Sequence, residues 1–308
     1  MIISDMHCDL PLYVADGRKL SSNEGQWSLD KLKNEHTYIQ VFANFVDKSL
    51  FDNPFERINS LIISFIRELA KTDMRLVTEK EELNYNISNG IHSAVLAIEG
   101  GEALGGKIEN IKYFYDLGVR FLTLTWNRVN QIGFASSPDV KKAPLTPFGK
   151  EVVKEMNRIG MIADVSHLCE EGFWSVAEIS TKPFCATHSN SKKLCNHHRN
   201  LTDEQFCEIV RCQGLVGVNY YNDFLEENPE DADIASIIKH IEHFMALGGE
   251  NVICLGGDLD GVDQLPNGLT GVGDVHKIAE ELAKINYSDV LIEKIMGKNV
   301  IDFLEQVL

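Results

Sequence analysis

The chain has 308 residues, of which 44% are hydrophobic and 24% are charged, so it is long and apolar enough to bury a large core. Its formal net charge is −17, because 29 lysine and arginine residues stand against 46 aspartate and glutamate residues. No basic block interrupts this acidic background, which argues against nucleic acid and anionic membranes as partners and favours a protein that handles small molecules.

Short apolar runs alternate with segments of helical periodicity along the first half of the chain. An apolar entry at residues 2–3 leads into a first strand that ends in His7-Cys8-Asp9. The other elements expected in this half are strand 38–44, helix 53–71, strand 93–98, helix 108–117, strand 121–125 and helix 148–158.

The same alternation continues to the C-terminus. The expected elements are strand 161–165, helix 170–179, strand 183–187, helix 203–211, strand 215–219, helix 235–247, strand 252–255 and helical segments 273–284 and 288–308. The eight strands are short and apolar on both faces, which is typical of strands in a buried parallel sheet.

Eight right-handed strand–helix units close most simply into a (β/α)8 barrel. An open doubly wound sheet is the alternative, but it needs a glycine-rich phosphate loop, and the sequence contains neither G-x-G-x-x-G nor a P-loop. No linker rich in proline, serine or glycine divides the chain. The sequence therefore predicts an α/β fold with one TIM-barrel domain over residues 1–308.

Cysteine usage and hydropathy predict the compartment. The N-terminus lacks the basic and apolar stretches of a signal peptide, and no run of about 18 apolar residues could span a bilayer. Seven cysteines, an odd number without a C-x-x-C pair, do not form the pattern of a disulfide framework. We therefore expect a cytoplasmic protein without a membrane segment, and the assembly stays open, with a homodimer as one candidate.

The polar residues of interest follow the predicted strands at their carboxyl ends. They are His7 and Asp9 after the first strand, Glu99 after the third, Trp126 after the fourth, His167 after the fifth, His188 after the sixth and Asp258 after the eighth. In a barrel these strand ends meet at one mouth, where barrel active sites lie.

This convergence of histidines and carboxylates indicates a metal centre. A single H-x-D motif such as His7-Cys8-Asp9 is more simply a hydrogen-bonded pair in a turn, but its recurrence at later strand ends favours metal ligands. Three histidines, two aspartates and one glutamate exceed the needs of one tetrahedral zinc ion and suit two ions that share a carboxylate. Two ions about 3.5–4 Å apart can hold a hydroxide and polarise a carbonyl beside it, which predicts metal-assisted hydrolysis.

Six motifs, in order and in register along the chain, carry a family resemblance. They are DMHCDLP, AIEGGEAL, IADVSH, ATHSN, HRNLTDEQ and GGDLDG. Together they resemble the membrane (renal) dipeptidase family of the amidohydrolase superfamily, and the resemblance covers the chain essentially from end to end. It implies an amidohydrolase-like, zinc-dependent barrel that takes a small dipeptide as its substrate.

The resemblance also implies a role for each matching residue. Two zinc ions per chain are implied, with Glu99 as the bridge between them and the ligands His7, Asp9, Glu99, His167 and His188. Asp258 would be the catalytic acid and base for the attacking water and the leaving amine. Arg199 would pair with the free carboxylate of the dipeptide, so a D-residue at the C-terminal position is expected to be tolerated.

One position departs from the family pattern. Trp126 stands where renal-type enzymes carry a histidine that is implied to contact the oxygen of the scissile bond. An indole N–H can donate one hydrogen bond but cannot ligate metal or become charged. Trp126 and the adjacent Asn127 are still expected to line the substrate site, with a substrate preference or rate that differs from the family's.

Three other functions stay open. An amidohydrolase that acts on N-acyl amino acids or lactones would use the same metals. A non-catalytic metal-stabilised or ligand-binding barrel would leave Asp258 without a role. A phosphoesterase on a similar barrel would cleave phosphate esters.

Several remaining polar residues are predicted to be structural. His240 and His243 are expected on a solvated helix face, and Asp260 in a turn. His197 and His198 are expected to be solvated or to lie at the rim of the pocket.

Overall fold

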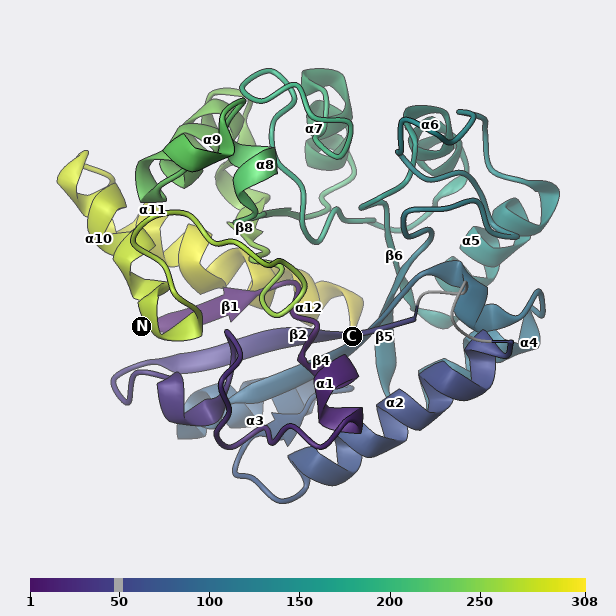
Figure 1. Ribbon diagram of the computed structural model, residues 1–308, viewed down its shortest axis with the longest axis horizontal. Coiled ribbons are helices and arrows are strands. Elements are labelled where there is room, and N and C mark those ends of the chain that lie inside the picture. Colours follow the sequence, from purple (N-terminus) through teal and green to yellow (C-terminus); the bar gives the residue numbers. More distant parts are fainter. Residues whose placement is uncertain (47–51) are drawn as a thin grey trace.

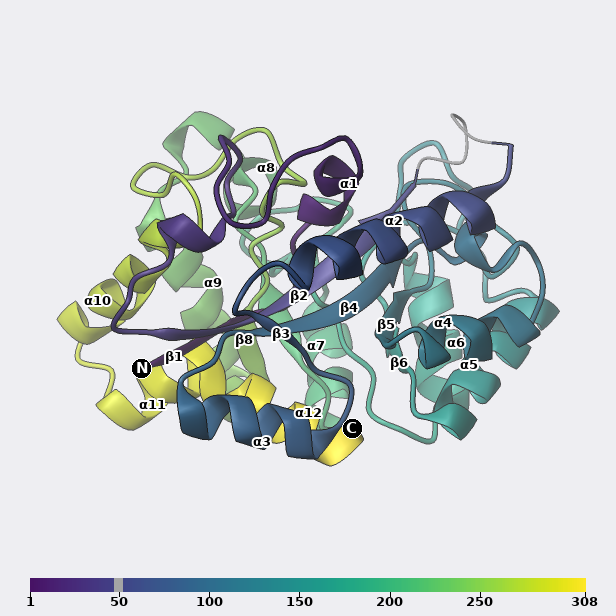
Figure 2. The same ribbon diagram turned by 90° about the horizontal axis from the view of Figure 1, so that it is seen from below.

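Parallel strands form a sheet that curls around a central axis in the computed structural model, which describes residues 1–46 and 52–308 (Figures 1 and 2). Their order along the sheet is β6-β5-β4-β2-β1-β8-β7, and the short strand β3 adds to β4. The strands are β1 (Ile2–Asp5), β2 (Thr37–Phe45), β3 (Arg75–Leu76), β4 (Ser93–Glu99), β5 (Val119–Thr123), β6 (Ile162–Asp164), β7 (Val216–Val218) and β8 (Ile253–Leu255).

The expected sixth barrel strand, 183–187, is not a regular strand, and this part of the prediction is wrong. The N–H of Thr187 donates to the side chain of Asp164 at 3.0 Å, so a carboxylate replaces a strand carbonyl as its acceptor. Single bridges nevertheless connect Cys185 to β6 and Ala186 to β7. These bridges complete a ring of hydrogen-bonded neighbours, and the predicted (β/α)8 barrel is confirmed.

Helices follow the strands and surround the sheet (Figure 1). They are α1 (Leu10–Ala15), α2 (Pro54–Leu69), α3 (Lys80–Asn89), α4 (Glu109–Asp116), α5 (Pro147–Ile159), α6 (Glu170–Ile179), α7 (Asp203–Arg211), α8 (Asn222–Leu225), α9 (Ile234–Ala246), α10 (His276–Lys284), α11 (Asp289–Glu293) and α12 (Asn299–Val307). The predicted helices agree with these bounds within a few residues. Asn53, for example, caps α2 by accepting a hydrogen bond from the N–H of Glu56.

Strand β3 and the helices α1, α3 and α8 are absent from the sequence-based expectation. Helices α1 and α8 span six and four residues, too few to produce a periodic pattern. Helix α3 is mostly polar, so its apolar stripe is weak. Strand β5 also begins two residues before the expected position, because Val119 already pairs with Leu96 on β4.

Two apolar layers line the barrel wall, and alternation along β2 separates them. Ile39, Val41 and Ala43 point into the barrel interior, whereas Tyr38 and Phe42 belong to the outer layer under the helices. The interior layer includes Val300, Phe303 and Leu304 of α12. Helix α12 therefore closes the end of the barrel where β1 begins, and the polar site lies at the other end.

A π-helical turn, Lys294–Lys298, links α11 to α12 and packs closely on β1. A Cβ atom on Gly297 would lie only 2.5 Å from the carbonyl oxygen of Ile2. Glycine at this position therefore allows the C-terminal helices to approach the first strand.

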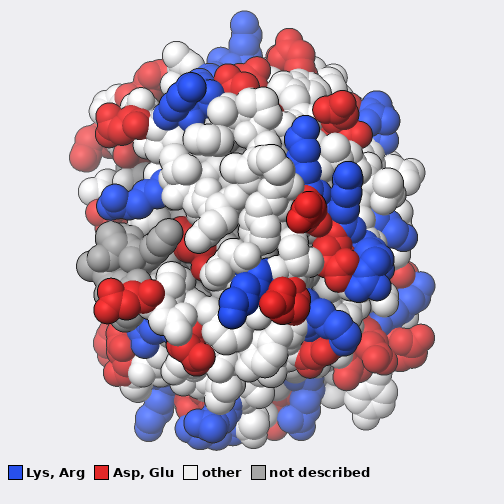
Figure 3. Space-filling view, turned by 90° about the vertical axis from the view of Figure 1, so that its right-hand side faces the viewer, with Lys and Arg blue, Asp and Glu red and all other residues white. Residues whose placement is uncertain are grey.

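The described surface carries charges of both signs. On the face formed by α4, α5 and α6, lysine and arginine side chains are interspersed with aspartate and glutamate (Figure 3). Within residues 1–46 and 52–308, no helix has both the length and the apolar character needed to cross a bilayer.

Candidate active site

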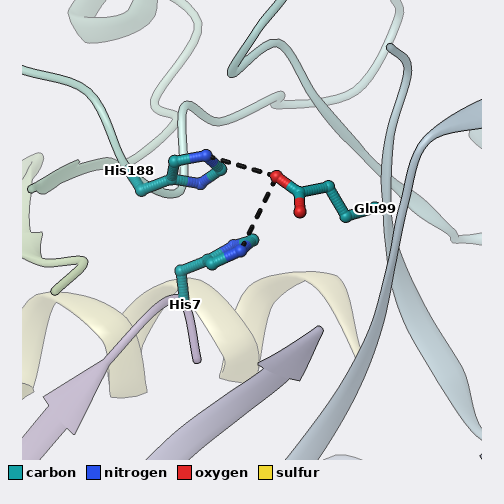
Figure 4. Close-up of side chains that lie close together, drawn as sticks. All are labelled: His7, Glu99 and His188. Atoms are coloured by element: carbon teal, nitrogen blue, oxygen red, sulfur yellow. Dashed lines mark ion pairs between the residues drawn. The ribbon is translucent and has the colours of Figure 1, made fainter. Parts of the chain in front are cut away.

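Three imidazoles from different strand ends surround the carboxylate of Glu99, the last residue of β4. Figure 4 shows two of them, those of His7 and His188. Glu99 Oε1 lies 3.0 Å from His167 Nε2, 3.4 Å from His188 Nε2 and 3.7 Å from His7 Nε2. All four side chains are buried, with exposed fractions of 8% or less. These four residues are spread over 182 positions of the sequence, so the barrel topology brings them together.

His7 connects this group to a second set of carboxylates. Its Nε2 atom lies 3.5 Å from Asp9 Oδ2 and 3.9 Å from Asp258 Oδ1. Two overlapping triads result, His7-Glu99-His188 and His7-Asp9-Asp258, and the candidate ligand atoms of each lie within 4.8 Å of one another. The geometry thus brings every predicted metal ligand, and Asp258, to one mouth.

Burial and the close approach of several charged groups shift the pKa values of the acids and of His7 in this cluster. Burial, with the nearby carboxylates of Glu99 and Asp258, raises the pKa of Asp9 to about 8 although His7 opposes this shift. Burial would also raise the pKa of Glu99, but the imidazoles of His7 and His167 outweigh it and lower the pKa. Burial would lower the pKa of His7, but Glu99 and Asp9 raise it well above its usual value. Positive charge is therefore favoured at the centre of the cluster.

Hydrogen bonds determine which nitrogen of His188 carries its proton. The Thr187 hydroxyl donates to the carboxylate of Asp164 at 2.7 Å, so its oxygen is left to accept from His188 Nδ1 at 2.8 Å. The same oxygen lies 3.4 Å from His7 Nδ1. Thr187 thereby turns the Nε2 lone pair of His188 toward Glu99.

Asn127 fixes His167 in the same way. Its amide oxygen lies 2.9 Å from His167 Nδ1 and can only accept, so Nδ1 carries the proton. Asn127 lines the cavity, as expected for a substrate contact, but the hydrogen bond that the structure gives it is to a candidate ligand. Sequence reasoning did not anticipate this second contact.

The donor set fits a divalent cation. His188 Nε2 and His7 Nε2 are buried without a hydrogen-bond partner, and so is Asp9 Oδ1. Burial lowers the pKa of both His167 and His188, so each is a neutral imidazole whose lone pair faces the Glu99 carboxylate. Two lone pairs at this distance repel one another unless a cation lies between them. Imidazole nitrogens and carboxylate oxygens are ligands that zinc prefers.

Asp258 is held in a strained backbone position beside the cluster. Its φ is +59°, in the left-handed region that non-glycine residues rarely adopt. The side-chain amide of Asn219 donates to Asp258 Oδ2 at 2.9 Å, and Oδ1 is the atom that faces His7. A Cβ on Gly261 would lie 2.1 Å from Asp9 Oδ2, so only glycine lets this turn come close to the acids.

Asp260 is a structural residue, as its turn position predicts. It accepts hydrogen bonds from the N–H groups of Gln26 and Trp27 at 2.8 and 3.2 Å, and from Arg18 at 3.0 Å. These contacts tie the loop before residue 28 to the turn that carries Asp258.

Arg199 is a buried cation on the cavity wall, 5% exposed. Its Nη2 atom donates to the carbonyl of His188 at 3.4 Å, its Nε has no partner, and its guanidinium lies 5.4 Å from the ring centre of Phe224. Burial lowers its pKa to about 10, so it remains charged at neutral pH. Because the described residues provide no ion-pair partner, this guanidinium is suited to an anionic group of a ligand.

A cavity of about 590 Å³ lies over the cluster, a size that suits a small-molecule ligand. Its wall includes the acids Asp9, Glu99 and Asp258 and the aromatic side chains Phe45 and Trp126. His197 and His198 are half-buried and also line it, which confirms their predicted place at the rim.

The prediction of a solvated helix face is wrong for His240. This side chain is 1% exposed, accepts a hydrogen bond from the N–H of Ser191 at 3.0 Å, and contacts the carbonyl of Leu225 at 3.0 Å through Nε2. Both partners contact α9 only in the folded barrel, so the helix pattern could not reveal them. His243 instead pairs with Asp203 at 2.7 Å, and both histidines are structural as predicted.

Three further contacts of the site were missed by sequence reasoning. They are Asp164 with Thr187, Asn219 with Asp258, and Phe45 with Trp126. Phe45 carried a usable signal, because it directly follows the expected strand 38–44 and therefore lies at the same mouth. Asp164 carried another, as an ionisable residue inside an apolar strand.

Comparison with known proteins gives a consistent result. The family model of the membrane dipeptidases, peptidase family M19, matches residues 1–308. An uncharacterized dipeptidase of Schizosaccharomyces pombe is 31% identical, and the match covers 96% of this chain and 78% of that protein.

Two solved structures are similar to the whole chain. A dipeptidase of family M19 has a TM-score of 0.91 at 26% identity and covers 100% of this chain and 98% of its own. A metallopeptidase from Rhodobacter sphaeroides, solved with a phosphinate mimic of the dipeptide L-Ala-D-Ala, also has a TM-score of 0.91, at 25% identity, and covers 100% and 99%.

Proposed function

The chain belongs to the membrane dipeptidase family, peptidase family M19, and we propose that it hydrolyses dipeptides at a two-metal centre in the barrel mouth. The observation that carries this proposal is the position of Glu99, whose Oε1 atom lies within 3.7 Å of imidazole nitrogens from three other strand ends. One carboxylate so surrounded is suited to bridge two cations.

The proposed ligands divide into two overlapping sets. His7, Asp9 and Glu99 would hold one ion, and Glu99, His167 and His188 the other. Zinc is the proposed metal, because its preferred ligands are imidazole and carboxylate. The proposed compartment is the cytoplasm, which is consistent with seven cysteines that are all unpaired.

The chemistry then divides between metals and side chains. When bound, the two cations supply Lewis acidity that polarises the scissile carbonyl and lowers the pKa of a water nucleophile. Asp258 presents Oδ1 to the cluster while Asn219 holds Oδ2, so Asp258 is placed to take the proton of the attacking water and give it to the leaving amine.

Arg199 would bind the C-terminal carboxylate of the dipeptide. Its charge is buried on the cavity wall and has no carboxylate partner among the described residues. A carboxylate of the substrate can therefore form an ion pair with the guanidinium. A D-residue at the C-terminal position would then be tolerated, because the carboxylate is the recognised group. The Rhodobacter sphaeroides structure, with its mimic of L-Ala-D-Ala, supports this stereochemistry.

Hydrolysis of L-Ala-L-Ala and L-Ala-D-Ala, before and after chelation and after zinc is restored, tests the function. We expect turnover that chelation abolishes and zinc recovers. Turnover that is insensitive to chelation would contradict the metal mechanism. Absence of turnover on both dipeptides by the zinc-loaded protein would contradict the dipeptidase assignment.

The role of Arg199 is tested by a pair of substrates. Arg199→Met should lower kcat/KM for L-Ala-L-Ala by about 100-fold, since a charged hydrogen-bonded pair is lost, and should hardly affect the C-terminal amide L-Ala-L-Ala-NH2. Equal effects on the two substrates would show that Arg199 does not bind the carboxylate.

A further inference from the structure

Two aromatic rings, those of Phe45 and Trp126, line the cavity side by side. Phe45 is the last residue of β2, and Trp126 follows β5. Their ring centres lie 4.4 Å apart with the ring planes tilted by 51°, which is a favourable aromatic contact. Both side chains are half-buried and face the cavity, so part of each ring is available to a ligand.

The barrel topology places these rings across the mouth from Arg199, the proposed site for the carboxylate of the substrate. Strands β2 and β5 are the two neighbours of β4, which carries Glu99, so the rings flank the centre of the cluster on one side. Arg199 follows the bridging segment 183–187, and Phe224 follows β7, four places around the ring from β4. The metal cluster therefore lies between an anion site and an aromatic wall.

We propose that Phe45 and Trp126 form a subsite for the side chain of the N-terminal residue of the dipeptide, and that this subsite selects large apolar or aromatic residues. The inference rests on the proposed dipeptidase function. With the C-terminal carboxylate at Arg199 and the scissile carbonyl over Glu99, the N-terminal residue extends across the mouth toward the rings. A histidine at position 126 would present a smaller and more polar surface there.

The physical basis is burial of apolar surface. The acids Asp9, Glu99 and Asp258 also line the cavity, whereas the ring pair is an apolar part of this mouth that favours an aromatic side chain over hydrogen. Glycine at the first position leaves the rings exposed to water. Selectivity for phenylalanine over glycine by a pocket of this kind is on the order of tenfold or more in kcat/KM.

Three substrates and three variants test the subsite. Values of kcat and KM are measured for L-Phe-L-Ala, L-Ala-L-Phe and Gly-L-Ala with the zinc-loaded protein. We expect kcat/KM for L-Phe-L-Ala to exceed both others about tenfold, mainly through a lower KM. Trp126→His and Phe45→Ala should each reduce the preference for L-Phe-L-Ala over Gly-L-Ala about fivefold.

Trp174→His is the matched control. Trp174 lies on α6, is 39% exposed and packs on Phe173, away from the cavity wall. Its replacement removes the same surface of indole and should leave the preference unchanged. A thermal unfolding curve for each variant identifies loss of folding, and Phe45→Leu replaces Phe45→Ala if the latter unfolds.

The possible outcomes distinguish a failure of the proposed subsite from a failure of the proposed dipeptidase function. Dipeptide turnover with equal kcat/KM for L-Phe-L-Ala and Gly-L-Ala overturns the subsite and leaves the dipeptidase proposal intact. A preference that survives both Trp126→His and the Phe45 change assigns it to another wall and also overturns the subsite. No turnover on any dipeptide overturns the proposed function and the subsite with it.

Discussion

Two buried carboxylates at the barrel mouth, those of Asp164 and Glu99, are almost equally hidden from solvent but have opposite surroundings. Asp164, 0% exposed, accepts hydrogen bonds from the hydroxyls of Thr123 and Thr187 at 2.6 and 2.7 Å, and from the N–H groups of Ser166 and Thr187 at 3.0 Å. Glu99, 4% exposed, instead has imidazole Nε2 atoms around Oε1.

This difference separates a carboxylate that holds the site in place from one that we propose takes part in its chemistry. The protein supplies every donor that Asp164 needs, so its charge is balanced and its position is rigid. Around Glu99, two neutral imidazoles present lone pairs rather than protons, and an ion must complete the set. Burial alone therefore does not identify a ligand, whereas the kind of neighbour does.

Removal of the Glu99 charge should have the largest effect. Glu99→Gln keeps the shape of the side chain but weakens the bridge, so both ions should be lost and dipeptide turnover should fall by about 10³-fold or more. Elemental analysis and kinetics on the same sample measure this. Retention of two ions by the variant would remove Glu99 from the bridging position.

Asp258 is intermediate between the two carboxylates, since one oxygen is held by Asn219 and the other faces the cluster. Asp258→Asn should lower kcat by about 10²–10⁴-fold and leave the metal content unchanged, because a proton carrier is lost and the proposed ligands are kept. A variant with full activity would contradict the acid–base role and would favour a non-catalytic barrel.

Among the histidines, too, some have all their hydrogen-bond partners within the protein, and His240 is such a residue. Its burial predicts that the stability of the fold depends on pH. His240 has both ring nitrogens in hydrogen-bonding contacts, and its pKa is lowered by burial to about 4 from the usual value near 6.5. The folded state then binds fewer protons than the unfolded state between these values, so this contribution is complete above pH 6.5 and is lost as pH falls toward 4.

We expect about 3 kcal/mol of unfolding free energy to depend on His240 across that range, from the difference in pKa. Urea unfolding of chelated wild-type protein and His240→Gln at several pH values measures it. The variant should be less stable at pH 7 and should show a shallower slope below pH 6.5. Parallel curves for the two proteins would contradict the assignment.

A smaller effect, on zinc affinity, is expected from changing Thr187, which connects Asp164 to His188 beside Glu99. Thr187→Val keeps the side-chain shape but removes the oxygen that accepts from His188, so zinc affinity should fall about 10–100-fold, while Thr187→Ser should retain it. Competition with a chromogenic chelator gives the affinities. Thr123→Val is the control, because Thr123 also donates to Asp164 but none of its hydrogen bonds reaches a histidine. Equal losses in Thr187→Val and Thr123→Val would contradict the proposed orientation of His188.

The strand ends and the candidate ligands that follow them were predictable from the sequence, because parallel strands that alternate with helices must direct their carboxyl ends to one mouth. The contacts that orient the ligands were not. Thr187 ends an expected strand and Asn127 is an expected substrate contact, but neither pattern reveals its histidine partner before the barrel brings Asp164 and His167 to them.

Two further misses have the same physical origin. The helix pattern assigns His240 to the solvent side because its partners, Ser191 and the carbonyl of Leu225, are 49 and 15 residues away in the sequence. The segment 183–187 was expected to be a strand from its apolar residues, but a buried carboxylate interrupts its ladder. Long-range polar partners, rather than local periodicity, decide both.

The metal content of the purified, zinc-equilibrated protein tests whether the barrel mouth holds two ions that share Glu99. Inductively coupled plasma mass spectrometry, with the protein concentration from amino-acid analysis, gives the number of ions per chain. We expect two ions per chain. One ion or none in a folded protein would contradict the bridging arrangement around Glu99.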